Sequence, residues 1–363
     1  MIIAFLAAQF WQVLPAQNSR NQALALARRA VRIMQKGQPQ GAQQLLEKAL
    51  QLDPENIHIQ YQLALAHYQQ KEYQKVCEIL DETTRDPEAP MEHFAFLGNA
   101  YDNLVDYENA SKAYKRGLRK YPNSGRLHVE LGIMALNQQQ VPEALRYWES
   151  GIDLDPSYAP NYYWAAKAYA NTPERLWALL YGEMFMLLAP QDSRIEEISK
   201  MLLRNYEESV EVIGEESVVF RFSLKAYSPQ GDRLLSLRSS PRSFEYAFAE
   251  RFQESEAAFS LGLSDPFVIA ASRNAFLQSW NLQPSLNEQF ANGLFPYWER
   301  LIEAGHWEAY HFWLLGAGDP ERFQLWATSG QNDVRLARFL EWQKQNPPFL
   351  EEEQRMNRIR YMK

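Results

Sequence analysis

The densest group of side chains that could bind a metal or transfer protons lies near the C-terminus, at Glu303, His306, Glu308 and His311. Histidines and carboxylates at short spacing could hold zinc or act as acid and base. The two histidines are five residues apart, which separates them by about 140° around a helix, whereas the zinc motif HExxH needs a spacing of four. The spacing therefore argues against a metal or catalytic site, and Gly305 places His306 at a helix start.

Two other features could suggest chemistry. The stretch Gly316 to Asp319 lacks the third glycine of a dinucleotide-binding loop, since Glu321 stands in its place, so we expect a loop that ends in an Asp319 helix cap. Cys77 is the only cysteine, which excludes an intramolecular disulfide and a cysteine-based zinc cluster. We expect Cys77 to be a small buried residue. The sequence predicts no catalytic residue, no cofactor and no metal.

Composition and charge restrict the class of protein. The 363 residues are 46% hydrophobic and 23% charged, which is typical of a folded globular chain. This length predicts two packing units or one long repetitive array. Lys and Arg number 37 against 45 Asp and Glu, a net charge of -8. Since neither half has a basic excess, we expect no nucleic-acid partner.

A spacing of 34 residues recurs through the first half of the chain. Pro54, Pro122, Pro156 and Pro190 are separated by 68, 34 and 34 residues. Other positions repeat in the same register: Leu63, Leu97 and Leu131; Gly98 and Gly132; Ala110, Ala144 and Ala178. Several columns in one register indicate a repeat architecture.

The repeat resembles the tetratricopeptide family, most completely in residues 91–124. The seven consensus positions there are filled by Phe94, Leu97, Gly98, Tyr101, Ala110, Tyr114 and Pro122. The resemblance implies five units of two antiparallel helices, at 23–56, 57–90, 91–124, 125–158 and 159–192. It also implies a right-handed solenoid that binds peptides or proteins on its concave face.

In this family the concave groove is lined by the first helix of each unit. The positions that line it here are mainly apolar and aromatic, and we select Tyr61, Leu65, Tyr68, Asn99, Val129, Ile133, Leu136, Tyr163 and Lys167. The basic and amide residues with which some members hold a C-terminal carboxylate are missing from the first repeats. The groove could take a partner helix or peptide, or it could be filled by the chain's own C-terminal half.

Residues 1–16 are mostly apolar and shorter than the run of about 20 residues that spans a bilayer. Their Pro-Ala ending before Gln17 resembles a signal peptidase site, so we expect a signal peptide and an exported, periplasmic protein. No Lys or Arg precedes the stretch, and Gln9 and Gln12 interrupt it. The alternative is a helix that caps the first repeat of a cytoplasmic protein. We expect no integral membrane segment in the mature chain.

Beyond the repeats, residues 193–210 are expected to form a helix that closes the array, with Ser193 and Glu196 as a capping box. Alternation in 217–225 suggests a strand, with a turn at 228–232 and a second strand at 234–238 that would complete a hairpin. Helical periodicity returns at roughly 243–262, 266–282, 293–304, 307–316, 320–328 and 333–346. The last residues, 349–363, are read as a tail.

The region 211–348 is dense in aromatic residues, including Trp280, Trp298, Trp307, Trp313, Trp326 and Trp342. At helical spacing such residues usually form a core, although aromatic platforms also bind sugars. The stretches RLWALLYGEMFML, ISKMLLRNYEE and AGHWEAYHFWLLGAGDPERFQLW resemble a group of exported bacterial tetratricopeptide proteins. That resemblance implies export and a separate C-terminal domain without supplying an activity.

These patterns predict an all-α protein with at most a small β-hairpin: a tetratricopeptide solenoid followed by an aromatic-rich helical domain. The predicted function is a non-enzymatic scaffold for a protein or peptide partner. The alternative is an enzyme or glycan-binding module in the C-terminal domain. Convergent Glu, His and Trp side chains around a pocket would favour the alternative, and an unbroken apolar core would favour the scaffold.

The export hypothesis makes a direct prediction. N-terminal sequencing of the protein purified from its native host should begin at or close to Gln17, because cleavage follows the small residue Ala16. A retained Met1 would contradict export by this route and support the cap-helix alternative.

Overall fold

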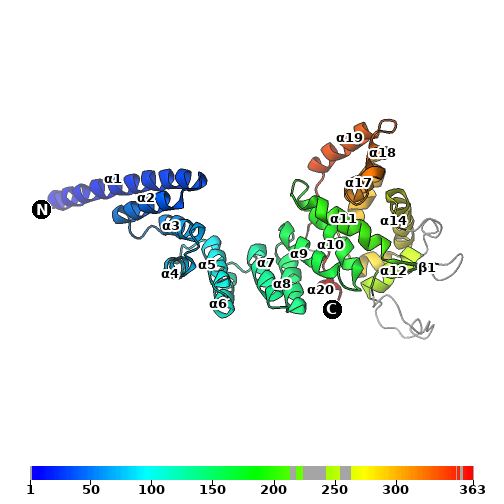
Figure 1. Cartoon of the computed structure of the whole chain (residues 1–363), viewed down its shortest axis with the longest axis horizontal. Coiled ribbons are helices and arrows are strands. Elements are labelled where there is room, and N and C mark those ends of the chain that lie inside the picture. Colours follow the sequence, from blue (N-terminus) through cyan, green and yellow to red (C-terminus); the bar gives the residue numbers. More distant parts are fainter. Residues whose placement is uncertain are drawn as a thin grey trace. The chain divides into compact units, whose positions relative to one another are not determined.

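The computed structural model describes residues 2–212, 218–223, 243–253, 263–348, 350–351 and 355–362, with only the backbone described at 2–16, 212 and 218 (Figure 1). Helices form most of this part of the chain, and its only sheet has two short strands. The all-α fold class is therefore confirmed. The chain divides into two compact units, Met1–Gln138 and Gln139–Lys363.

Unit 1 is a succession of helices, each packed on the next. They are α1 (Ile2–Gln35), α2 (Pro39–Leu52), α3 (Ile57–Gln69), α4 (Tyr73–Thr83), α5 (Met91–Asn103), α6 (Tyr107–Lys120) and α7 (Gly125–Asn137). Asn56, Asp106 and Ser124 begin α3, α6 and α7, because each side chain accepts a hydrogen bond from a first-turn backbone amide. The predicted signal segment lies within α1, and its cleavage stays a prediction.

The turns inside the helix pairs repeat with the period of the sequence. Gly37, Lys71, Val105 and Gln139 all have positive φ, between 61° and 75°, and they are 34 residues apart. For a residue with a Cβ this conformation costs roughly 1 to 2 kcal/mol, so the helix packing on both sides must hold it. Pro173 stands one period later. Because proline fixes φ near -65°, residue 173 cannot adopt the positive φ of the other turns.

The core of unit 1 consists of small and branched apolar side chains between successive helices. One cluster joins α1, α2 and α3 through residues such as Ala30, Leu46 and Ile59. A second joins α3 to α6 through Val76, Leu80, Leu97 and others, and it contains Cys77. Burial raises the pKa of the Cys77 thiol to about 12, which keeps it protonated and unreactive. The expectation that Cys77 is a buried small residue is confirmed.

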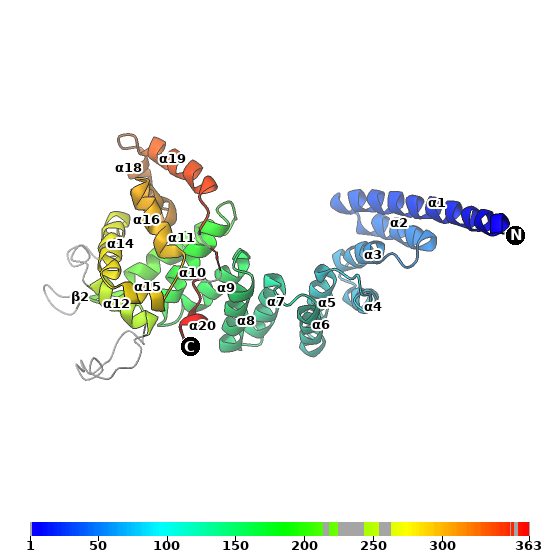
Figure 2. The same ribbon diagram turned by 180° about the vertical axis from the view of Figure 1, so that it is seen from behind.

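Unit 2 begins with three helices that continue the same spacing: α8 (Val141–Leu154), α9 (Ala159–Tyr169) and α10 (Arg175–Leu188). They are followed by α11 (Ile195–Glu207), β1 (Val210–Val212), β2 (Val218–Phe220) and α12 (Phe244–Gln253). The remaining helices are α14 (Pro266–Asn281), α15 (Pro284–Gln289), α16 (Leu294–Glu303), α17 (Trp307–Leu315), α18 (Pro320–Ala327), α19 (Asn332–Gln345) and α20 (Arg358–Tyr361) (Figure 2).

Helix α10 is the centre of unit 2. Every residue from Leu176 to Leu187 is buried, as expected for a helix that is apolar on all sides. It packs on α9 and α11, and its side chains reach α12, α14, α16 and α17. The aromatic residues of 211–348 form much of this core: Phe244, Phe276, Trp280, Phe295 and Trp298 are all buried. The prediction of an aromatic core is confirmed for Phe276, Trp280, Phe295 and Trp298, whereas Trp307, Trp313 and Trp342 are half-buried.

One local prediction is wrong, and the predicted hairpin is not tested. Ser193 and Glu196 form no capping box: α11 starts after Arg194, whose backbone amide is held by Asp192 (2.9 Å). Strand β2 pairs antiparallel with β1, which precedes it, with Val210 opposite Phe220. The predicted turn at 228–232 and strand at 234–238 lie outside the described residues, as do 254–262 of the predicted helix 243–262.

The division into units also differs from the expected domain division. The sequence boundary between the two compact units falls between Gln138 and Gln139. Helices α8, α9 and α10 therefore belong to the same unit as the C-terminal helices. Helix α11 contacts both α10 and α17, and it is therefore internal to unit 2. The predicted limits of the five repeats, the closing helix and the C-terminal domain stay a prediction.

Gly98 provides a test of the repeat packing. A Cβ at this position would overlap the ring of Tyr114 on the paired helix α6. Gly98→Ala should therefore destabilise unit 1 by about 1 to 3 kcal/mol, measured by urea unfolding followed by circular dichroism. In the control Gly41→Ala, the Cβ would meet only an Ile33 methyl at 3.5 Å. Equal stability of both variants would show that this contact does not limit helix approach.

Candidate functional site

The structure places the predicted groove residues on first helices in both units. Helix α3 carries Tyr61, Leu65 and Tyr68, α5 carries Asn99, and α7 carries Val129, Ile133 and Leu136. Tyr163 and Lys167 lie on α9, in unit 2. The predicted groove positions are therefore divided between the two units.

The surface of α3 and α5 in unit 1 is aromatic. The Tyr61 ring stacks on His93 at 4.6 Å between centroids and meets the edge of Phe96 at 5.5 Å. Tyr68 packs on Phe96 at 5.1 Å, and its hydroxyl accepts a hydrogen bond from Asn103 (3.1 Å). His93 and Phe96 are buried, whereas Tyr61 and Tyr68 are half-buried. We call Tyr61, Tyr68, His93 and Phe96 the α3–α5 aromatic surface.

His93 contributes to this surface as a neutral ring. Burial lowers its pKa to about 4, and the neighbouring His58 acts in the same direction. Its Nδ1 lies 3.2 Å from the Thr83 hydroxyl. Sequence reasoning did not select His93, because it is not at one of the repeat positions that face the groove. Its stacking on Tyr61 could have been inferred only from the register between α3 and α5.

A polar group adjoins the aromatic surface along α5 and α7. The side-chain amide of Asn99 lies 2.5 Å from the Tyr114 hydroxyl. In the flipped amide orientation, which satisfies the hydrogen bonds of Asn99, its nitrogen donates to Glu130 Oε2 at 3.3 Å. Burial raises the pKa of Glu130, and Arg126, at 3.9 Å, opposes that rise. Burial also raises the pKa of Asp102. This end of the surface can therefore exchange hydrogen bonds with a polar ligand.

Some predicted groove residues serve the core instead. Leu65 packs against both apolar clusters of unit 1. Val129 is also buried, with 6% of its surface exposed. Leu65, Ile133 and Leu136 are nevertheless half-buried, like Tyr61 and Tyr68, so apolar as well as aromatic side chains remain at this surface.

In unit 2 the corresponding face of α9 is covered by α11. The Tyr163 hydroxyl donates to Glu197 Oε2 (2.8 Å), and Lys167 forms an ion pair with Glu197 Oε1 (2.8 Å). The Arg194 guanidinium lies over the Tyr163 ring, 4.3 Å from its centroid. The chain itself therefore occupies these two predicted groove positions.

A buried ionic network in unit 2 resembles a catalytic group in its residue types. Glu183 Oε1 accepts hydrogen bonds from Arg273 (2.6 Å), Trp298 Nε1 (2.7 Å) and the Tyr310 hydroxyl. Arg273 Nη1 lies 3.1 Å from His311 Nε2, and its guanidinium lies 3.7 Å from the centre of the Trp298 ring. Burial and the adjacent Arg273 hold the pKa of His311 well below its usual value, so this histidine is neutral.

The network is inaccessible to a substrate. Arg273 and His311 are completely buried, and Glu183 is 2% exposed. His306, in contrast, is the residue before α17 and packs on Trp342 and Phe339 without capping the helix through its side chain. In the part of the chain that the structure describes, no group of three or more His, Cys, Asp or Glu side chains could hold a metal.

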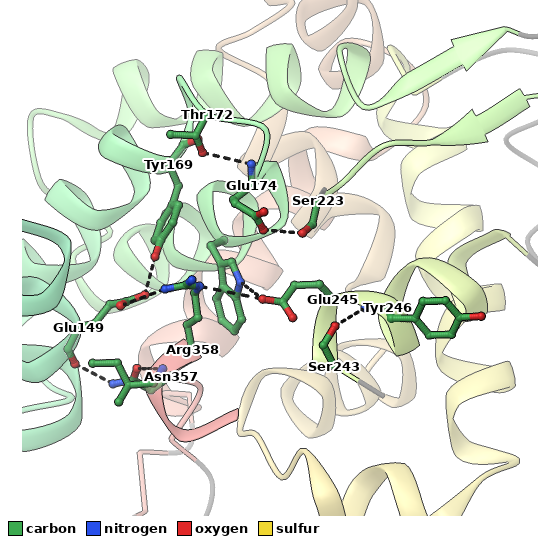
Figure 3. Close-up of polar contacts among 12 residues, drawn as sticks. Glu149, Tyr169, Thr172, Glu174, Ser223, Ser243, Glu245, Tyr246, Asn357 and Arg358 are labelled. Atoms are coloured by element: carbon green, nitrogen blue, oxygen red, sulfur yellow. Dashed lines mark hydrogen bonds and ion pairs between the residues drawn. The ribbon is translucent and has the colours of Figure 1, made fainter. Parts of the chain in front are cut away.

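A second buried network attaches the C-terminal segment to unit 2 (Figure 3). Arg358 lies between Glu149 of α8 (3.6 Å) and Glu245 of α12 (4.0 Å), and Glu149 also accepts a hydrogen bond from Tyr169 (2.8 Å). Burial raises the pKa of Glu149, and Arg358 opposes this rise. The Asn357 amide donates to the Glu149 carbonyl (2.7 Å). Residues read from the sequence as a tail are thus part of the core.

Comparison with known proteins identifies the repeats. Two sequence models of the tetratricopeptide repeat match the chain, one over residues 34–88 and the other over residues 97–159. These two segments are therefore similar to tetratricopeptide repeats. It is 23% identical over 119 residues to the TPR repeat-containing protein YpiA of Bacillus subtilis (strain 168). This similarity covers 33% of the chain but only 28% of YpiA.

Two solved structures are similar to the chain over about half its length. A thermophilic TPR protein from Thermus thermophilus is 20% identical, with a TM-score of 0.41, over 50% of this chain and 99% of that one. PilF of Pseudomonas aeruginosa is 18% identical, with a TM-score of 0.44, over 53% of this chain and 85% of that one.

The repeats support a role as a protein–protein interaction scaffold, since such arrays present extended surfaces built from successive helices. Among the described residues, the structure contains no helix with the length and apolar composition needed to cross a bilayer.

The Glu183 network predicts a stability effect. Arg273→Met leaves a buried carboxylate without its cation and should destabilise unit 2 by about 3 to 5 kcal/mol. The double variant with Glu183→Leu should recover at least half of that loss, because no unpaired charge remains. Tryptophan fluorescence during guanidinium unfolding measures this directly, since nine of the ten tryptophans belong to unit 2.

Lys344→Met is the control for this comparison, because it removes a cation from the exposed pair with Glu341. Its unfolding midpoint should match the wild type. A loss from Arg273→Met as small as that of the control would show that the buried ion pair does not hold unit 2 together.

Proposed function

We propose that this protein is a non-enzymatic scaffold that binds a helix or peptide of another protein on the α3–α5 aromatic surface of unit 1. The observation that carries the proposal is the pair of half-buried tyrosines, Tyr61 and Tyr68, supported from below by the buried rings of His93 and Phe96. Rings held in place by packing lose little conformational freedom on binding.

The chemistry of this surface defines the ligand. Burying one apolar anchor of a partner between the two tyrosines contributes roughly 1.5 to 3 kcal/mol. Asn99 and Glu130 stand beside the rings and can exchange hydrogen bonds with polar groups of the partner. A partner helix with an apolar stripe beside a polar one therefore fits this surface.

In unit 2 the chain itself contacts two of the predicted groove positions, although not through the C-terminal half that the alternative named. Tyr163 and Lys167 are engaged by Glu197 and Arg194 of the segment around α11, which precedes the predicted C-terminal domain. We therefore assign partner binding to unit 1. We also propose that the protein acts after export, on the basis of the signal-like residues 1–16.

An enzymatic or glycan-binding role for the C-terminal domain is less well supported. The Glu183, Arg273 and His311 side chains converge, which is the arrangement that would have favoured catalysis, but they are buried against one another. Trp280 and Trp298 are also buried, so neither offers a face to a sugar ring.

Photo-cross-linking in the native host tests the proposal. A photoreactive phenylalanine analogue at Tyr68 should form an adduct with one defined protein, because the Tyr68 ring is at the surface that we assign to the partner. The same analogue at Leu325, which is 71% exposed in unit 2, should not form that adduct.

Affinity measurements complete the test. Replacing Tyr61 and Tyr68 together by Ala should weaken binding of the captured protein at least tenfold, while circular dichroism remains that of the wild type. If the adduct forms at Leu325 alone, or if the double variant binds as tightly as the wild type, the partner surface lies elsewhere.

A further inference from the structure

Helix α6 carries an unusual concentration of positive charge. In a chain of net charge -8, its fourteen residues include five basic residues and one acidic residue, Glu108. The basic residues are Lys112, Lys115, Arg116, Arg119 and Lys120. Their spacing of three and four residues places them along one face of the helix. We call these five residues the α6 basic face.

Only part of this charge is neutralised within the chain. Lys112 pairs with Glu108 one turn away, and both side chains are well exposed. Arg116 is 3.5 Å from Asp81, and Lys120 donates to the Ala89 carbonyl (2.8 Å). Within the described residues, no acidic side chain lies within ion-pair distance of Lys115 or Arg119, and both are exposed.

A cavity of about 310 Å³ opens beside the basic face. Its lining combines the buried Leu97 and Ala113 and the half-buried Tyr101 with polar groups of Asn109, Lys112, Arg116 and Arg119. Asp81, which accepts a hydrogen bond from Tyr101 (2.5 Å), also lines it. The cavity is large enough for one apolar side chain, and cations lie next to it.

We propose that the α6 basic face binds an acidic segment of a partner protein. An apolar side chain of that segment enters the cavity between Leu97, Tyr101 and Ala113, and its neighbouring carboxylates pair with Lys115, Arg119 and Lys112. This surface is formed largely by a second helix of a repeat, so it is distinct from the α3–α5 aromatic surface and does not depend on the function proposed above.

Charge and shape favour an acidic protein segment over a phosphate-rich ligand. Asp81 places a carboxylate in the cavity lining, which repels a multiply charged phosphate that enters deeply but not an apolar side chain. A lipid surface could approach the exposed lysines, but the polar side chains of Asp81, Asn109 and Arg116 in the cavity lining disfavour entry of an acyl chain. A peptide that combines Leu with Glu satisfies both parts of the site.

The test uses the full-length protein and a fluorescein-labelled peptide of repeated Leu-Glu-Glu. Fluorescence anisotropy should show saturable binding that weakens as salt rises, because exposed charges are screened over about 8 Å at physiological ionic strength. A Gly-Glu-Glu peptide should bind at least tenfold more weakly, since it leaves the cavity empty. A Leu-Gln-Gln peptide, which has no charge, should show a similar loss.

Charge-reversing variants locate the site. Lys115→Glu together with Arg119→Glu should reduce affinity for the Leu-Glu-Glu peptide at least tenfold. The control is Arg28→Glu together with Arg29→Glu on α1, which changes the net charge equally at two exposed positions of the same unit. Circular dichroism should be unchanged in both double variants.

Three outcomes would overturn the proposal. The first is equal loss of binding in both double variants, which would show only an effect of net charge. The second is equal binding of the Leu-Glu-Glu and Gly-Glu-Glu peptides, which would exclude the cavity. The third is binding to phosphatidylserine vesicles but to none of the peptides, which would assign the basic face to a membrane surface.

Discussion

Burial of helix α10 is the constraint on which unit 2 depends. A helix with apolar residues on every side cannot lie on the surface of a solenoid, where one side of each helix contacts water. The twelve consecutive buried residues from Leu176 to Leu187 therefore require helices around the whole circumference. Helices α9 and α11 provide part of this cover, and α12, α14, α16 and α17 provide the rest. The last predicted repeat thus becomes the core of a larger unit.

The polar side-chain groups of the buried helix α10 must form hydrogen bonds or ion pairs inside the protein. Glu183 is within this helix and accepts hydrogen bonds from three different helices, through Arg273, Trp298 and Tyr310. Trp177, two turns earlier, donates to Glu245 of α12 (3.0 Å). An unpaired buried charge costs far more than a missing apolar contact, so these bonds fix the register of the surrounding helices more strictly than apolar packing alone. The residue types of a catalytic site are used here for structure.

Features that depend on interactions between neighbouring residues could be predicted from the sequence, and features that depend on contacts between distant segments could not. The repeat spacing and most helices of both units could be predicted, because periodicity and helix caps such as Asp319 are local signals. The short helices α15 and α20 were not predicted. The partner of β2, the role of Asn357 and Arg358, and the packing of Leu65 against two core clusters could not be predicted. Each of these depends on which distant helix or strand supplies a neighbour. The capping box at Ser193 failed for the opposite reason, because the competing Asp192 and Arg194 contact is local but stronger.

The covered face of α9 indicates how the exposed face of α3 can be used. Tyr163 and Tyr61 are 102 residues apart, which is three periods, so they hold the same place in their repeats. In unit 2 that tyrosine donates its hydroxyl to a carboxylate and takes a guanidinium over its ring. The Tyr61 ring stacks on His93, and burial raises the pKa of its hydroxyl, with Arg126 opposing this rise and Glu92 adding to it. Unit 2 thus shows one set of contacts that suits this repeat position. They come from a basic residue, Arg194, and an acidic residue, Glu197, which lie three residues apart at the start of α11. At Tyr61 the chain itself supplies a basic and an acidic neighbour, Arg126 and Glu92, so a partner there would add mainly apolar contact with the ring, as the proposed anchor does.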